Sequence, residues 1–126
     1  ETRRLAGLVK LASENATLKA RAVGIEFSHN SYRFLVRNAS SEWIPLNDKI
    51  FRKRLIPNNL QIEIELFGKL KKFKLDDTLG PQVLLSASGE ITPFTARISL
   101  RNEKAFYQLK AQFGGYVAIE DLETTQ

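Results

Sequence analysis

The spacing of the apolar residues changes near residue 23, and this change constrains the fold more than any other feature of the sequence. Over residues 2–22 the apolar side chains recur at intervals of three and four, which gives one stripe along an α-helix: Leu5, Leu8, Val9, Ala12, Ala16 and Ala20. From Val23 onward apolar and polar residues alternate, which is the period of a strand with one buried face. The chain therefore predicts a helix over residues 1–23 and a β-rich part over residues 24–120.

Alternating runs separated by turn residues predict seven to nine short strands. The runs on either side of His29 predict a hairpin with a loop of three or four residues, and further hairpins are predicted around Gly68 and around residues 102–104. We therefore expect an α+β fold, in which an N-terminal α-helix packs on an antiparallel β-sheet that is split into two sheets. The whole chain, residues 1–126, is predicted to be a single domain.

Two single residues near the predicted helix carry specific expectations. Gly24 follows the helical stripe, so we expect it close to the C-cap. Trp43 is the single tryptophan of the chain and is expected to act as a lid on the core between helix and sheet. Pro45, two residues later, predicts that this short strand lies at a sheet edge, because proline cannot donate a ladder hydrogen bond.

The start of the helical stripe predicts a longer helix than the one present. The stripe begins without a capping residue followed three positions later by glutamate, and the sequence opens with Glu1 rather than with methionine. We interpret this as a truncated helix, with Thr2 as a cap in the alternative interpretation, and an upstream targeting or membrane segment stays open. Within residues 1–126, no run of about 18 apolar residues predicts a membrane span.

Positive charge is concentrated in the middle of the chain, although the net charge is +5. The window 49–74 contains eight basic residues and two acidic ones, while the last seven residues carry an excess of negative charge. One interpretation places these lysines on the solvated face of a hairpin, with Glu63 and Glu65 opposite Lys72 and Lys74. The other is a surface that attracts phosphate or an acidic protein face, with these candidate residues: Arg52, Lys53, Arg54, Lys69, Lys71, Lys72 and Lys74.

The residues that usually carry catalysis are few and isolated. The chain has no cysteine, which excludes thiol catalysis, zinc–thiolate sites and disulfides, and its one histidine, His29, is expected in a turn. The acidic pair at residues 76–77 is typical of a turn, and Ser86 and Ser88 stand outside any Gly-x-Ser-x-Gly motif. We therefore expect no enzyme activity, no cofactor and no metal site.

Aromatic residues next to basic ones allow two interpretations. Tyr32, Arg33 and Phe34 follow one another, as do Phe73 and Lys74, and such interleaving occurs at sites that bind single-stranded nucleic acids. The same spacing is that of core aromatics that alternate with solvated cations, and we favour the core for Phe34 and Phe73.

The stretch "SASGEITPFTARISL", residues 86–100, places proline just before an alternating run. Gly89 can adopt backbone angles closed to other residues, and Pro93 cannot donate to a ladder. We interpret this stretch as a kinked entry into an outer strand, in which Pro93 stops that strand from extending and Phe94 fills the core.

Several of these stretches, in order, resemble the minor pseudopilins of the H type from type II secretion systems (general secretion pathway protein H). The helix "RLAGLVKLASENATLKARAVGIEF" is similar to the helix of that family, "SYRFL" and "WIPL" to its Tyr-x-Phe-Leu and Trp-x-Pro-Leu pair, and "RLIPNNLQIEIEL" to its next strand. The run "PQVLLSASGEITPFTARI" resembles its most specific motif, which includes Gly89, Glu90, Thr92, Pro93 and Phe94.

The resemblance implies a structural role in protein export. It implies a subunit of the periplasmic pseudopilus, near its tip, which supports export of folded proteins through the outer-membrane secretin. Its partners would be the major and minor pseudopilins, with the secretin or an exoprotein as further contacts, and the isolated domain would be a monomer. The full-length form would be anchored once in the bacterial inner membrane, with the globular domain in the periplasm.

A second family shares the same domain and keeps an alternative open. Some minor pilins of type IV pili, of the fimbrial T kind, bind DNA for uptake through basic residues near their C-terminus. The tail "EDLETTQ" of this chain is acidic and lacks that basic end, so we do not expect nucleic acid as the partner. The basic window 49–74 is the feature that favours the DNA-binding alternative.

Overall fold

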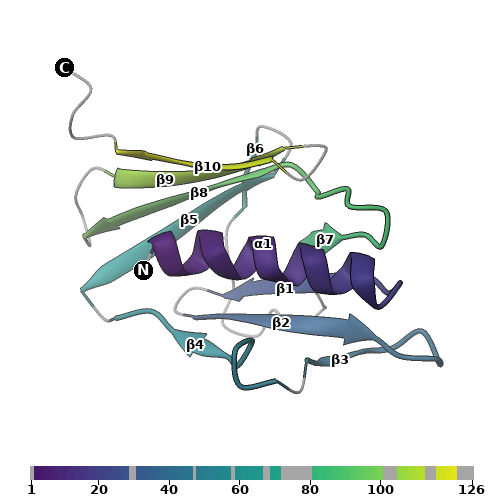
Figure 1. Cartoon of the computed structure of the whole chain (residues 1–126). Helices are drawn as coiled ribbons and strands as arrows, with labels where there is room; N and C mark the ends of the chain where they lie inside the picture. Colours follow the sequence, from purple (N-terminus) through teal and green to yellow (C-terminus); the bar gives the residue numbers. More distant parts are fainter. Residues whose placement is uncertain are drawn as a thin grey trace.

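The computed structural model describes residues 2–28, 31–46, 48–57, 59–66, 69–71, 81–100, 105–112 and 116–121. Within these residues one helix, α1 (Thr2–Leu18), is followed by ten strands in two antiparallel sheets (Figure 1). The first sheet has the order β3 (Trp43–Pro45), β2 (Ser31–Arg37), β1 (Val23–Ser28) and β7 (Val83–Leu85), and β4 (Arg54–Leu55) also pairs with β2. The second has the order β10 (Tyr116–Asp121), β9 (Ala105–Gln112), β8 (Phe94–Leu100), β5 (Leu60–Leu66) and β6 (Lys69–Lys71).

Helix α1 packs across both sheets with one face. Its buried residues follow the spacing that the sequence predicts, and they are Leu5, Ala6, Leu8, Val9, Ala12 and Ala16. The helix contacts β9 and β10 of the second sheet as well as β1 and β7 of the first, and Figure 1 shows it lying over the region between the two sheets. The α+β class and the division into two sheets are therefore confirmed.

The helix ends at Leu18, before the predicted end at residue 23, and the residue that caps its C-terminus is not the expected glycine. Ala20 takes a positive φ of 49°. The Arg21 N–H donates to the Ala16 carbonyl at 3.0 Å and the Ala20 N–H to the Thr17 carbonyl at 3.3 Å. These two hydrogen bonds form a Schellman motif with Ala20 at the left-handed position, which glycine usually occupies.

Gly24 has a different role from the predicted one, since it lies inside β1 and not at the helix end. A Cβ built there would come within 2.5 Å of the Pro81 Cγ and 3.2 Å of the Trp43 Cζ3. Because strand side chains alternate, this contact lies on the face of β1 opposite to Val23 and Ile25, which are buried in the core. Trp43 thus packs on the outer face of the first sheet, and the prediction that it covers the core between helix and sheet is wrong.

The core joins the two sheets through aromatic rings. The ring of Phe27 on β1 lies 5.8 Å from that of Phe94 on β8 and 6.2 Å from that of Tyr32 on β2. Phe34 is 1% exposed and packs 5.3 Å from Phe51. The predicted core positions of Phe34 and Phe94 are therefore confirmed, whereas Phe73 lies outside the described residues.

The hairpins agree with the sequence in position but differ in detail. In the first, Ser28 pairs with Ser31, so the connection holds two residues instead of three or four, and His29 lies outside the described residues. In the second, Ile64 pairs with Lys71. The predicted partners of the two glutamates there, Lys72 and Lys74, also lie outside the described residues.

On the outer face of the second sheet, one of those two glutamates forms an ion pair. The Arg97 Nη1 on β8 lies 2.8 Å from the Glu65 Oε2 on β5. Both side chains are about one-third exposed. This pair gives Glu65 a partner on the neighbouring strand of the same sheet.

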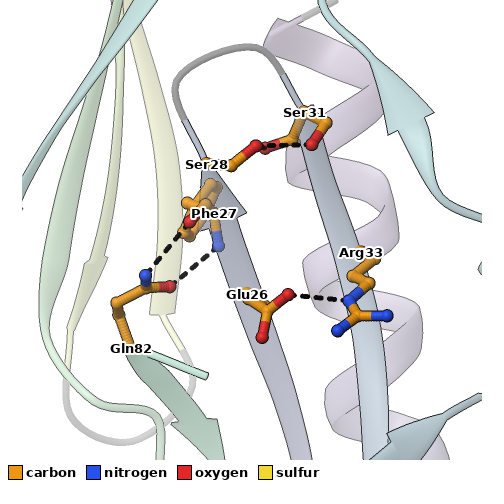
Figure 2. Close-up of polar contacts among 6 residues, drawn as sticks. All are labelled: Glu26, Phe27, Ser28, Ser31, Arg33 and Gln82. Carbon is orange, nitrogen blue, oxygen red and sulfur yellow. Dashed lines mark hydrogen bonds and ion pairs between the residues drawn. The ribbon is translucent and has the colours of Figure 1, made fainter. Parts of the chain in front are cut away.

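A side-chain amide extends the first sheet beyond the end of β7. Gln82 precedes β7, and its Oε1 accepts the Phe27 N–H at 2.8 Å while its Nε2 donates to the Phe27 carbonyl at 3.0 Å (Figure 2). Both backbone groups of Phe27 on this side of β1 are thereby satisfied, as a further strand residue would satisfy them.

In the described part of the chain no helix has the length and apolar character for crossing a membrane.

Candidate assembly surfaces

The stretch Ser86–Phe94 forms the crossover from the first sheet to the second. The Ser86 N–H donates to the Glu90 carbonyl at 2.8 Å, and the Gly89 N–H donates to the Ser86 carbonyl at 3.1 Å. Gly89 has a φ of 93°, a left-handed conformation that glycine adopts without strain. The turn returns the chain so that Ile91, which is 1% exposed, enters the core. The residues of the family motif thus build a corner.

Thr92 closes the free edge of the first sheet. Its N–H donates to the Leu84 carbonyl at 2.9 Å, and its Oγ1 accepts the Leu84 N–H at 3.0 Å. Leu84 is the middle residue of β7, the edge strand on this side. A blocked edge cannot pair with a strand from another chain.

Pro93 and Phe94 then begin the second sheet, and here one prediction is wrong. Strand β8 pairs with both β5 and β9, so it is the middle strand of five and not an outer strand. Pro93 is compatible with that position because it stands one residue before β8, where no ladder hydrogen bond is required.

The basic window of the sequence is divided between the two sheets. Arg52 and Lys53 lie in the segment before β4, and Arg54 lies on β4, where its Nη2 donates to the Ile50 carbonyl at 3.1 Å. Lys69 and Lys71 lie on β6 at the edge of the second sheet, and Figure 1 shows β6 and β4 on opposite sides of the molecule. Lys72 and Lys74 lie outside the described residues. The described candidate residues therefore belong to two different sheets.

A hollow of about 520 Å³ lies beside Arg52 and Lys53. Its lining combines apolar residues from β2 and from the end of β3 with charged residues from the following segment: Arg33, Phe34, Pro45, Leu46, Asp48, Lys49, Phe51, Arg52 and Lys53. We call this feature the basic hollow. It contains four basic residues and one acidic residue, so an anionic group is favoured inside it.

Sequence reasoning did not select Arg33 or Lys49 as site residues. Arg33 pairs with Glu26 across the first hairpin, with 2.7 Å between its Nε and the Glu26 Oε1 (Figure 2). The alternating pattern of the sequence could have predicted this ion pair, since Glu26 and Arg33 lie opposite each other when Ser28 pairs with Ser31. A three-residue loop would have shifted this pairing by one residue.

The face of α1 that points away from the sheets carries two large apolar residues. Leu11 is 46% exposed and Leu18 is 85% exposed. They are seven residues apart, which places them on one side of the helix together with Gly7. Much of the surface of this stripe is therefore free to contact another molecule.

Residues that could perform catalysis do not gather in the described part of the chain. No group of three or more metal-ligating side chains occurs there. Ser86 and Ser88 form a hydrogen bond to each other within the crossover turn. Neither serine has a described histidine partner.

One long helix laid across two antiparallel sheets, with an unpartnered outer helix face, defines a pilin-like fold. A solved structure of the minor pseudopilin EpsH from the type 2 secretion system of Vibrio cholerae has this fold, with a TM-score of 0.85 to this chain at 25% identity. The similarity covers 99% of this chain and 96% of that one.

The family model for "Type II transport protein GspH" matches residues 1–115 of this chain, so the chain belongs to that family. The type II secretion system protein H of Escherichia coli K12 is 34% identical over 95 residues, which are 73% of this chain and 54% of that protein. The protein of the same name from Pseudomonas aeruginosa is 30% identical over 110 residues, 80% of this chain and 62% of that protein. The chain thus spans little more than half the length of these relatives, and the predicted family resemblance is confirmed.

Proposed function

We propose that this chain is the globular domain of a minor subunit of the type II secretion pseudopilus, and that it supports the export of folded proteins across the outer membrane. The observation that carries this proposal is the combination of the family match over residues 1–115 with a helix whose outer face has no packing partner. The family match supports a structural role.

Other pseudopilins of the same secretion system are the proposed partners. Leu11 and Leu18 on α1 supply an apolar contact, and the basic side chains of the window 49–74 supply contacts to acidic faces of neighbouring subunits. We place the subunit near the tip of the pseudopilus, with the globular domain in the periplasm and an inner-membrane anchor in the full-length protein. This placement draws on the family resemblance.

The alternative function, capture of DNA by a type IV pilus, is not favoured. The named relatives are type II secretion proteins. Of the aromatic residues that would stack on bases, Tyr32 and Phe34 are in the core, each 1% exposed, whereas Phe73 lies outside the described residues.

Deletion of the gene in its host tests the proposed function. We expect the loss of secreted enzymes from the culture medium and their retention in the periplasm, and we expect the full-length gene on a plasmid to restore secretion. A strain that lacks the protein and still secretes normally, in the same growth phase as the parent strain, would contradict the proposal.

A further inference from the structure

Three of the four cations of the basic hollow have no ion pair within the described residues. They are Lys49, Arg52 and Lys53. Asp48, the acidic residue of the lining, accepts the Ile50 N–H at 2.8 Å and so serves the local turn. Three neighbouring cations without a partner repel one another, and an anion from outside would relieve that repulsion.

Arg33 adds a cation that is already held in place. Its Nε donates to the Glu26 carboxylate at 2.7 Å, and the Glu26 side chain is 12% exposed. In Figure 2 the bond to Glu26 runs from Nε alone, and neither terminal nitrogen of the guanidinium forms a hydrogen bond with the residues drawn. A guanidinium fixed through Nε can offer both terminal nitrogens to one carboxylate, which is the strongest geometry for such a pair.

The floor of the hollow is apolar and closed to bases. Phe34 and Phe51 pack against each other at 5.3 Å and are 1% and 5% exposed, while Pro45 and Leu46 complete the lining. Buried rings cannot stack on nucleobases, whereas the exposed apolar edge of Pro45 can receive an aliphatic side chain. The combination of cations and an apolar floor suits a protein segment better than a nucleic acid.

Strand addition to β2 is not available as the mode of binding beside the hollow. Strands β3 and β4 both pair with β2 on this side, and the Leu46 N–H donates to the Phe34 carbonyl at 2.9 Å between them. A segment bound in the hollow would therefore be recognised through its side chains and not through a ladder with β2.

We infer that the basic hollow binds an acidic segment of a neighbouring pseudopilin, with one carboxylate on the terminal nitrogens of Arg33, further carboxylates on Lys49, Arg52 and Lys53, and an aliphatic side chain against Pro45. The inference rests on the proposed function for the identity of the neighbour. The proposed site does not include the lysines of β6, which lie on the other sheet.

The test is co-purification of the other pseudopilins with the tagged full-length protein from its host. The variant Arg52→Glu with Lys53→Glu reverses two charges in the hollow. The control Lys10→Glu with Lys19→Glu makes the same change in net charge at two exposed lysines that lie outside the hollow and have no ion pair within the described residues. We expect the first variant to retain about a tenth or less of the wild-type yield of one particular pseudopilin, and the control to retain nearly all of it.

Two further measurements keep the result interpretable. The milder variant Arg52→Gln with Lys53→Gln, together with a thermal melt of each purified domain, separates lost binding from lost folding. Reversal of an acidic cluster on the captured pseudopilin should restore co-purification with the Glu variant. Unchanged co-purification with a folded Arg52→Glu, Lys53→Glu variant, or no pseudopilin captured by the wild-type protein, would overturn the inference.

The outcomes distinguish this inference from the proposed function and from nucleic-acid binding. If deletion stops secretion but charge reversal changes neither capture nor secretion, the hollow is not the contact although the proposed function stands. If deletion leaves secretion intact while capture still depends on Arg52 and Lys53, the proposed function fails and the acidic contact stands. Binding of a fluorescent single-stranded oligonucleotide that persists at about 150 mM salt and is lost on charge reversal would overturn the inference in favour of phosphate recognition.

Discussion

Ala20 and Gly24, four residues apart, occupy backbone positions that their residue types do not usually take. Ala20 occupies the left-handed position of the Schellman motif although it has a Cβ. Gly24 lies in a strand where a Cβ would collide with Pro81. From sequence alone, a glycine just past a helical stripe is the natural choice for the C-cap. The close approach of Pro81, which comes from a distant part of the chain, could not be read from local spacing.

Replacement of Ala20 by glycine should stabilise the domain. The substitution removes the steric cost of a left-handed alanine, and we expect the free energy of unfolding to rise by about 0.5–1 kcal/mol after the extra entropy of glycine in the unfolded chain is included. Urea denaturation followed by circular dichroism measures the change. A loss of stability would contradict the assignment of Ala20 to the left-handed position.

Replacement of Gly24 by alanine should destabilise the domain, and Gly7 provides the matched control. An added Cβ at Gly24 would force Pro81 to move, at a cost of about 1–3 kcal/mol. An added Cβ at Gly7 meets nothing within 4 Å and lies inside a helix, so Gly7→Ala should gain about 0.5–1 kcal/mol. Equal effects of the two alanines in the same denaturation assay would show that close packing at Gly24 is not the reason for the glycine.

Among the secondary-structure elements, the edges of the first sheet depend on single side chains. On β7 the Oγ1 of Thr92 accepts the Leu84 N–H. Thr92→Val keeps the shape but removes this acceptor, and we expect a loss of about 1 kcal/mol in the free energy of unfolding. Thr92→Ser retains the hydroxyl and should lose less than half of that. If valine and serine are equivalent in a thermal melt, the hydroxyl does not hold this edge.

The type and order of the secondary-structure elements could be predicted better than the pairing of the strands within the sheets. Alternation gave the strands around Ile25, Phe34, Ile64 and Ile98, because each has one buried face in the structure. The proline rule placed Pro93 at an outer strand, but the absence of an N–H shows only that the ladder begins after that residue. Which strands flank β8 depends on pairings with β5 and β9 that are set by the whole core.

For the whole molecule, we propose that one face of helix α1 serves folding and the other serves assembly. The variant Leu11→Gln with Leu18→Gln changes exposed positions only, and we expect the free energy of unfolding to change by less than about 0.5 kcal/mol while secretion from the host falls strongly. Leu5→Ala, on the buried face, should instead cost about 2–5 kcal/mol. Normal secretion with both glutamines present would remove the helix face from the assembly surface.

The candidate sites could be predicted only in part, because surfaces combine residues from distant segments. Arg52 and Lys53 are adjacent in sequence and stay together in the hollow, but Lys69 and Lys71 belong to the other sheet. A count of charges in the window 49–74 adds these residues together. It contains no information about the sheet to which each of them belongs. The contribution of Arg33 depends on the exact register of the first hairpin.

The most direct test of the central claim, that this domain is built into a pseudopilus, is photo-crosslinking in living cells from position 18. Leu18 is 85% exposed on the outer face of α1, so a photoreactive residue there should leave the fold intact. We predict a light-dependent adduct between this protein and another pseudopilin of the same secretion system. The absence of any adduct with a pseudopilin, in cells that secrete normally with the substituted protein, would contradict the account.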